Sequence, residues 1–155
     1  MSNAKGIGIG IGIGVAVVIV ALVVIGFNAG SQHGIVPTQH TMSIVNSMIR
    51  VEPGQYSYYQ FSAPAGSSSV SVSGTFQAGG GSGNDIKVLI LDEQNFINYR
   101  NGHQANVYYS SGQETVGNIN IDVPAGQTLY LVYDNTFSVV SGKEVTTNVN
   151  LTYTS

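Results

Sequence analysis

The feature that most constrains this chain is an apolar run near its N-terminus. From Gly6 to Phe27 there are 22 residues without a charged or polar side chain. As a helix rising about 1.5 Å per residue, such a run spans a hydrocarbon core about 30 Å thick. In lipid the backbone groups must bond within the segment, which a helix allows. The run therefore predicts a transmembrane helix over residues 6–27, although the Gly-Ile alternation of its first half would favour a strand in water.

The charges on the two sides of this run predict its orientation. Lys5 and the amino terminus precede it, whereas residues 28–49 contain neither lysine nor arginine. By the positive-inside rule, residues 1–5 are cytoplasmic, residues 28–41 form a linker, and residues 42–155 form an extracytoplasmic domain at the cell membrane. The alternative is a signal peptide cleaved near Ser31, but signal h-regions usually run only about 7 to 15 residues. We therefore favour an uncleaved anchor.

Small residues recur every four positions within the predicted helix. Gly6, Gly10 and Gly14 would lie along one helix face, where two backbones can approach closely, as in small-xxx-small dimers. This spacing raises the possibility of a homo-oligomer formed through the helix. The alternative is a lipid-facing helix of low complexity that acts only as a tether.

The composition excludes several classes of protein. There is no cysteine, which rules out a disulfide framework, a zinc-thiolate site and a thiol nucleophile. Charged residues make up 8% of the chain, about a third of the usual share, and the five lysines and arginines are scattered. A nucleic-acid partner would need a basic patch, so we expect none. The predicted domain must stay soluble through serine, threonine, asparagine and glutamine.

After the linker, short period-2 segments alternate with Pro/Gly turns. No stretch after Phe27 shows a convincing 3.6-residue period, and residues 92–104 read as a long polar connection. The predicted strands cover residues 42–51, 56–62, 70–76, 86–91, 107–110, 117–123, 129–133 and 145–153. The nearly continuous apolar run 86–91 is typical of a central strand that is buried on both faces. About eight such strands predict an all-β antiparallel sandwich or jelly roll.

One segment carries a family resemblance. An aromatic strand beginning at Leu129 runs into Asp134-Asn135-Thr136-Phe137-Ser138, and Lys143 then opens the closing strand, which ends near Tyr153. This pattern resembles the end of the GOLD domain, the β-sandwich of p24 cargo-receptor and Sec14-like proteins, with a looser match back to Val51. The resemblance implies a β-sandwich that acts as a non-catalytic interaction module.

The same resemblance has clear departures. The p24 proteins carry a disulfide and a C-terminal membrane helix after a coiled coil, whereas this chain has no cysteine and its apolar run is N-terminal. We therefore carry over the fold and not the vesicle-sorting role. Independently of the family, Asp134 and Asn135 can hold a tight strand exit through bonds to their own backbone, and Phe137 is expected to fold back on the core.

No arrangement of residues indicates catalysis, a cofactor or a metal. The chain lacks Gly-x-Ser-x-Gly, His-Glu-x-x-His and a phosphate-binding glycine loop, so we do not expect an enzyme. The histidines, His33, His40 and His103, lack the spacing of metal ligands. Acidic residues at strand ends could converge on calcium, but local turns that their side chains cap are the favoured interpretation. Those positions are Asn84-Asp85, Asp92-Glu93, Asp122 and Asp134-Asn135.

Two further surface features are noted. Asn150-Leu151-Thr152 is the only N-glycosylation sequon, and strand alternation places Asn150 on an outward face. Tyr56, Tyr58 and Tyr59 must occupy both faces of one strand, so one of them could be exposed and stack on a sugar or a protein. Packing in the core and at its rim is the favoured alternative for these tyrosines.

Taken together, these features predict a membrane-anchored, extracytoplasmic, non-catalytic module for protein or glycan interaction at the cell surface. Two alternatives stay open. One is a structural subunit of a surface filament or pilus, in which the apolar N-terminus packs in the filament. The other is an accessory subunit of an envelope transport complex.

Overall fold

The computed structural model describes residues 36–81 and 83–155. Several predictions concern other residues and lie outside this part of the chain. They are the cytoplasmic segment 1–5, the transmembrane helix 6–27, the linker up to residue 35, and the helix interface at Gly6, Gly10 and Gly14. Within the described residues, no helix is both long enough and apolar enough to cross a bilayer.

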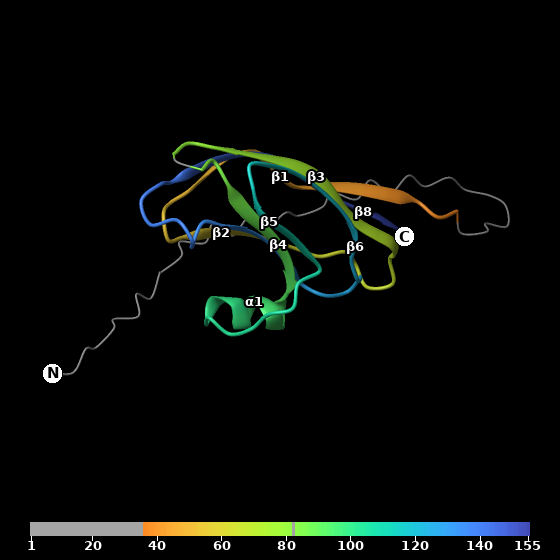
Figure 1. The fold of residues 1–155 in the computed structure, drawn as a ribbon. Helices are drawn as coiled ribbons and strands as arrows, with labels where there is room; N and C mark the ends of the chain where they lie inside the picture. The colour runs from red at the N-terminus through yellow and green to blue at the C-terminus, as the bar shows by residue number, and fades with distance from the viewer. Residues whose placement is uncertain (1–35, 82) are drawn as a thin grey trace.

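In the described part of the chain, eight strands form two antiparallel sheets of four (Figure 1). The elements are β1 (Gln39–Val51), β2 (Tyr56–Phe61), β3 (Ser68–Gly79), β4 (Ile86–Asp92), α1 (Glu93–Arg100), β5 (Tyr109–Glu114), β6 (Val116–Asp122), β7 (Leu129–Asp134) and β8 (Lys143–Thr154). Sheet A has the order β1-β8-β3-β6, and sheet B has the order β2-β7-β4-β5.

The pairing pattern identifies the kind of sandwich. The pairs β1·β8, β2·β7, β3·β6 and β4·β5 are nested in the sequence and alternate between the two sheets. This is the arrangement of a jelly roll, in which one long folded-over hairpin wraps into two sheets. The predicted all-β antiparallel sandwich of about eight strands is confirmed.

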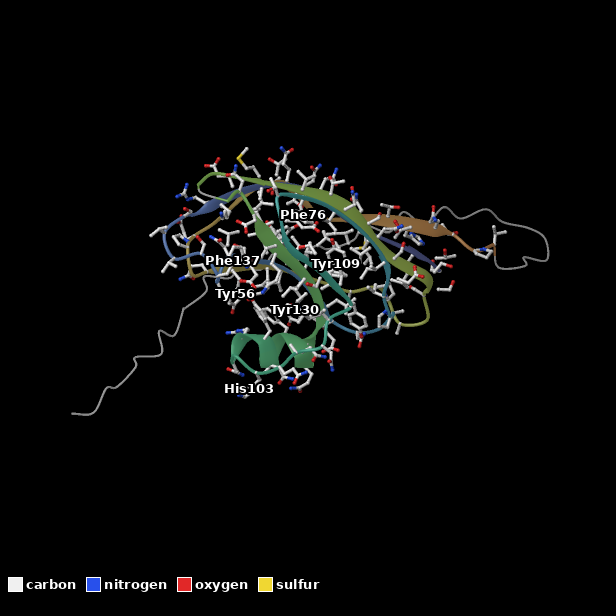
Figure 2. All side chains as sticks on the ribbon, viewed as in Figure 1. Tyr56, Phe76, His103, Tyr109, Tyr130 and Phe137 are labelled. Carbon is white, nitrogen blue, oxygen red and sulfur yellow. The ribbon has the colours of Figure 1, made fainter. Side chains whose placement is uncertain are left out.

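The main core lies between the sheets. In β8, Val145, Val149 and Leu151 are fully buried and alternate with exposed residues, as the period-2 pattern predicted. Figure 2 shows Phe76 in this interior layer. Its ring fills the space opposite Gly117 of β6, where an added Cβ would collide with it. Burying a side chain of this kind stabilises the fold by about 1.5–3 kcal/mol.

The central strands β4 and β7 of sheet B are buried on both faces, because α1 covers their outer face (Figure 1). The run 86–91 forms the central strand β4 and is buried on both faces, which confirms that prediction. Every residue of β7 is also buried, whereas the sequence predicted alternation there. The outer layer is aromatic: Phe96 of α1 stacks on Tyr130 of β7 with 4.1 Å between ring centroids.

The helix α1 corrects the prediction that residues 92–104 are a polar connection. Only Phe96 is fully buried, so the segment has no apolar stripe at helical spacing. The helix is held instead by its ends. Asp92 Oδ1 accepts a hydrogen bond from the Asn95 backbone N–H at 2.7 Å. Glu93 in the first turn and Arg100 in the last complement the helix dipole.

Two strand boundaries also differ from the prediction. The linker was expected to extend to Thr41, but β1 begins at Gln39, because polar residues there pair with the end of β8. The strand predicted at 107–110 is β5, which runs from Tyr109 to Glu114. Its second half is polar and contains Gly112, so pairing with β4 extends it where no alternation of apolar residues could indicate a strand.

The strands define two ends of the sandwich. The chain enters β1 at the proximal end, where Gln39 pairs with Thr154, and Thr38 and Ser155 exchange backbone hydrogen bonds. At the distal end Val51 pairs with Lys143. The β1–β2 turn (52–55), the described residues of the β3–β4 loop (80–81 and 83–85) and the β7–β8 loop (135–142) all lie at the distal end. With about 3.3 Å per residue, β1 separates the two ends by about 40 Å.

Candidate functional site

The β7–β8 loop at the distal end is fixed by one buried side chain. Asn135 is fully buried, and its Nδ2 group donates to the backbone oxygens of Val51 at 3.2 Å, Glu52 at 3.1 Å and Ser141 at 2.9 Å. Its own backbone N–H donates to Gln55 O at 2.9 Å. One asparagine thus joins the β7–β8 loop to the β1–β2 turn, and adds a donor to the Glu52 and Ser141 oxygens, which also accept from Gln55 N–H and Ser138 Oγ.

Serine side chains close the loop on itself. Ser138 Oγ donates to Ser141 O at 3.0 Å and accepts from the Ser141 backbone N–H at 3.2 Å. The backbone N–H of Gly54 donates to Ser138 O at 2.8 Å. Gly54 has a φ of 71°, a left-handed conformation that glycine adopts without strain. The loop is therefore held in one conformation from both sides.

Between these serines, the loop exposes two apolar side chains. Val139 is 89% exposed and Val140 is 87% exposed, the highest values among the exposed large hydrophobic residues of the described chain. Single exposed apolar residues are ordinary on protein surfaces. Two adjacent exposed valines at the tip of a loop held by side-chain hydrogen bonds are less ordinary, because nothing in the fold requires them to be apolar. We refer to Val139 and Val140 as the distal tip.

Two ion pairs lie beneath the distal loops. Lys143 is 1% exposed, and its Nζ lies 3.2 Å from Asp85 Oδ1. Lys87 Nζ lies 2.8 Å from Oδ2 of Asp134, which is also 1% exposed. The other oxygen of Asp134 accepts from the Thr136 backbone N–H at 2.8 Å and from its hydroxyl at 2.6 Å. These contacts compensate two carboxylates and two ammonium groups that would be costly to bury alone.

The helix α1 contributes Tyr99 to the same region. Burial, together with the negative charge of the nearby Asp134, raises the pKa of the Tyr99 hydroxyl well above its usual range. Tyr99 also packs edge-on against Tyr56 of β2, with 5.3 Å between ring centroids. The hydroxyl is therefore neutral at physiological pH and is unsuited to act as a base.

The structure brings together most of the residues singled out by the GOLD-like motif. Asp134, Asn135, Ser138 and Lys143 all lie at the distal end and stabilise its loops. Phe137 was expected to fold back on the core, but it is only half-buried and belongs to neither hydrophobic cluster. It follows the turn in which the Thr136 backbone N–H donates to Asp134 Oδ1, and is labelled in Figure 2.

The acidic positions considered for calcium have other roles. Asp92 caps α1, whereas Asp85 and Asp134 are paired with lysines. Among the described residues no three histidine, aspartate or glutamate side chains are grouped to hold a metal. Of the histidines, His33 lies outside the described residues, His40 stacks on Tyr153, and His103 is exposed after α1 (Figure 2).

The tyrosines of β2 pack rather than project. Tyr56 and Tyr58 lie on the outer face of sheet B and contact Phe96, whose ring centroid is 6.3 Å and 4.8 Å away respectively. Tyr59 points to the other face, edge-on to Tyr133. All three are half-buried, which agrees with the favoured interpretation as core and rim packing.

A second surface feature is a shallow hollow on sheet A. It has a volume of about 260 Å³ and is lined by Asn46, Ser47, Met48, Thr75, Thr146, Thr147 and Asn148. The predicted sequon residue Asn150 lies on the same sheet, away from the distal loops, and is partly exposed. Neither feature shares residues with the distal tip.

The distal tip was missed from the sequence. Its only signal is Val139-Val140 flanked by serines, after a turn motif and outside any period-2 segment. That pattern shows a loop, but exposure depends on Asn135 and Ser138 holding the loop away from the sheets.

Comparisons with known proteins give limited information. No protein-family model matches the chain, and no curated protein matches it. Among solved structures, it is similar to PliG of Aeromonas hydrophila, a periplasmic inhibitor of g-type lysozyme. The two are 15% identical, the match covers 82% of this chain and 93% of that one, and the TM-score is 0.32.

Proposed function

We propose that this chain is a membrane-anchored, extracytoplasmic and non-catalytic jelly-roll module that binds a protein partner through its distal tip. The observation that carries the proposal is the exposure of Val139 and Val140 on a loop fixed by buried and partly buried side-chain hydrogen bonds. A loop already held in its bound conformation loses little conformational entropy on association. Burying both valines in a partner would remove apolar surface from water at about 25 cal/mol per Å².

The position of the tip supports this proposal. The apolar run 6–27 precedes β1, and β1 begins at the proximal end of the sandwich. A membrane anchor there would leave the opposite end, about 40 Å away along β1, free to meet a partner. The tip would then face away from the membrane that carries the chain.

The surrounding charges favour a protein over a lipid surface. Peripheral membrane contacts combine apolar side chains with free basic residues. At the distal end, Arg50 is paired with Glu52 at 2.6 Å and with Glu144 at 3.7 Å. Lys87 and Lys143 are paired with aspartates. The cations named here are thus already paired with carboxylates, which suits contact with an apolar recess on a protein better than with an anionic lipid surface.

The GOLD-like resemblance is part of this proposal as a resemblance in fold. The resemblance in fold is supported by the role of four motif residues, which stabilise the distal loops. These residues are Asp134, Asn135, Ser138 and Lys143, and this structural role alone can account for the motif. A motif of this kind leaves the tip residues between Ser138 and Lys143 free to differ from one binding module to another. No partner is carried over from the family.

Site-specific photocrosslinking tests the binding proposal. A photoreactive amino acid is placed at Val140 in the full-length chain, in cells that naturally make it. The matched control places it at Val36, which is 80% exposed at the proximal end. We expect a discrete protein adduct at position 140 and none at 36, and we expect Val139→Ser to reduce its yield at least fivefold. No adduct at position 140, or equal adducts at both positions, would contradict the proposal.

The location is tested separately. Protease added to intact cells should remove the β domain while leaving a membrane-bound fragment that contains residues 6–27. Complete protection of the domain until the membrane is opened would place it in the cytoplasm. Recovery of the domain without the apolar segment would instead indicate a cleaved signal peptide.

A further inference from the structure

The outer face of sheet A carries an N-glycosylation sequon, which is separate from the distal tip. Asn150 and Thr152 are two residues apart on β8, so both side chains point outward, and both are partly exposed. They belong to the only Asn-x-Thr/Ser sequon in the chain. Asn150 Nδ2 donates one hydrogen bond, to Asn148 Oδ1 at 3.2 Å. Because an amide nitrogen carries two hydrogens, the other is available for replacement without loss of that bond.

The neighbours of Asn150 leave room for a substituent. β8 lies between β1 and β3, and the residues directly opposite Asn150 are Ser43 on one side and Ser73 on the other. Serine is among the shortest polar side chains, so the side chains beside Asn150 project little from the sheet. Thr152 has similarly small neighbours, Thr41 and Ser71.

The surface next to the sequon is neutral and polar. Asn148 contacts Asn150 and also lines the hollow of about 260 Å³ on this face. The hollow contains amide, hydroxyl and thioether side chains and no charged group. Hydroxyl-rich sugars can hydrogen-bond to amides and hydroxyls without displacing an ion pair. On β8 and β1 the nearest charged residues are Glu144 and Arg50, which pair with each other at the distal end. Across the sheet, the exposed Asp122 of β6 pairs with Ser71, the neighbour of Thr152 on β3.

The topology allows modification before the sandwich closes. β8 is the last strand, and its partners on β1 are more than 90 residues earlier in the chain, for example Thr152 with Thr41. Contacts between residues so far apart form late, because the intervening loop must first be ordered. Until then Asn150 lies in an unpaired, extended segment that an enzyme at the membrane surface can reach.

We propose that Asn150 carries an N-linked glycan that lies over the outer face of sheet A. This rests on the proposed extracytoplasmic location of the domain. The donor is a sugar activated as a polyprenyl phosphate or pyrophosphate ester, used by a membrane oligosaccharyltransferase. Asn150 Nδ2 forms a bond to the anomeric carbon, the bond from that carbon to the phosphate oxygen breaks, and the leaving group is polyprenyl phosphate from the phosphate ester or polyprenyl pyrophosphate from the pyrophosphate ester. One amide proton is released.

The glycan gives sheet A a distinct role. It would cover the hollow and the centre of this face, and would prevent side-by-side packing of neighbouring copies through sheet A. The distal tip lies at the end of the sandwich and would stay free for its partner.

The test is the mass of full-length protein purified from membranes of cells that naturally make it. Cleavage after Lys143 releases a peptide that contains Asn150 and begins at Glu144. We expect this peptide to carry a sugar mass in most molecules, and fragmentation to place it on Asn150. Asn150→Gln and Thr152→Val should lose that mass completely, whereas Thr152→Ser and Asn148→Gln should keep it.

The outcomes separate this inference from the proposed function. A domain that external protease digests, but whose Asn150 peptide is unmodified, overturns the glycan and leaves the anchored binding module standing. A sugar mass that survives Asn150→Gln also overturns it. If the domain is protected from protease in intact cells and its Asn150 peptide is unmodified, both the glycan and the extracytoplasmic binding module are overturned. Since intact mass does not depend on folding, a destabilised variant still gives an answer.

Discussion

At the proximal end the sandwich is closed by strand pairing, whereas at the distal end it is closed by buried polar side chains. β1 and β8 pair from Gln39·Thr154 onward, and backbone bonds between Thr38 and Ser155 continue the ladder to the last residue. The distal loops have no ladder to continue. Asn135 and the pairs Lys87–Asp134 and Lys143–Asp85 take its place.

This difference shows what an exposed irregular loop requires. A strand end satisfies its backbone groups by adding one more pair, and its side chains can then be almost anything. An irregular loop leaves carbonyls and N–H groups unpaired, and these must find side-chain partners if they are buried. The distal end therefore depends on a few specific residues, whereas the proximal end depends on many interchangeable ones.

The largest expected effect is that of Asn135→Ala. It leaves the backbone oxygens of Val51, Glu52 and Ser141 without their common donor. We expect a loss of about 3 kcal/mol in the free energy of unfolding, measured by denaturant unfolding of the full-length chain in detergent. The control is Asn148→Ala on the exposed face of sheet A, which should change stability by less than about 0.5 kcal/mol. Equal effects of the two variants would show that the distal loops do not depend on Asn135.

The second expected effect is that of Lys87→Met. The substitution keeps much of the apolar stem but leaves the Asp134 carboxylate, which is 1% exposed, without its cation. Because the Lys87 side chain is itself 33% exposed, solvent screens part of the pair, and we expect a loss of about 2 kcal/mol. The double variant Lys87→Met/Asp134→Asn should recover part of this loss. A double variant no more stable than Lys87→Met would argue against an uncompensated charge as the cause.

The contrast between strand pairing and side-chain contacts also explains which parts of the fold could be predicted from the sequence. Strands β3, β6 and β8 each bury one face, so alternation such as that of Val145 and Val149 revealed them. The jelly-roll pairing is long-range, but turns and strand number already favoured a sandwich. The polar start of β1 and the second half of β5 show no alternation of apolar residues. They are strands because they pair with β8 and β4.

The candidate site could be predicted only in part. The motif that ends in Lys143 indicated a structured corner, and Asp134 and Asn135 do hold it. Residues 92–104 were misjudged, because α1 depends on a cap at Asp92 and on one buried ring, Phe96, rather than on an apolar face. The exposure of Val139 and Val140 could not be predicted, since it follows from contacts made by residues far away in the sequence.

A smaller effect concerns pH. The pKa of Tyr99 is raised by burial and by the Asp134 charge, whereas in the unfolded chain a tyrosine ionises near pH 10. The stability contributed by the neutral hydroxyl is thus complete below about pH 10 and is lost as the pH rises toward its pKa in the fold. Between pH 9 and 11 we expect a loss of about 1 kcal/mol from this residue. Tyr99→Phe should lessen the loss, whereas replacing the exposed Tyr108 should not.

The smallest expected effect lies at the proximal end. His40→Ala removes a ring stacked on Tyr153 at 5.0 Å and a hydrogen bond to Ser155 Oγ at 2.8 Å. Both contacts are near the surface and the β1–β8 ladder stays intact, so we expect a cost of about 0.5 kcal/mol. The measurement is the same denaturant unfolding that is applied to Asn135→Ala. A cost similar to that of Asn135→Ala would mean that the proximal end also depends on a single side chain. The two ends would then differ only in which residue holds them.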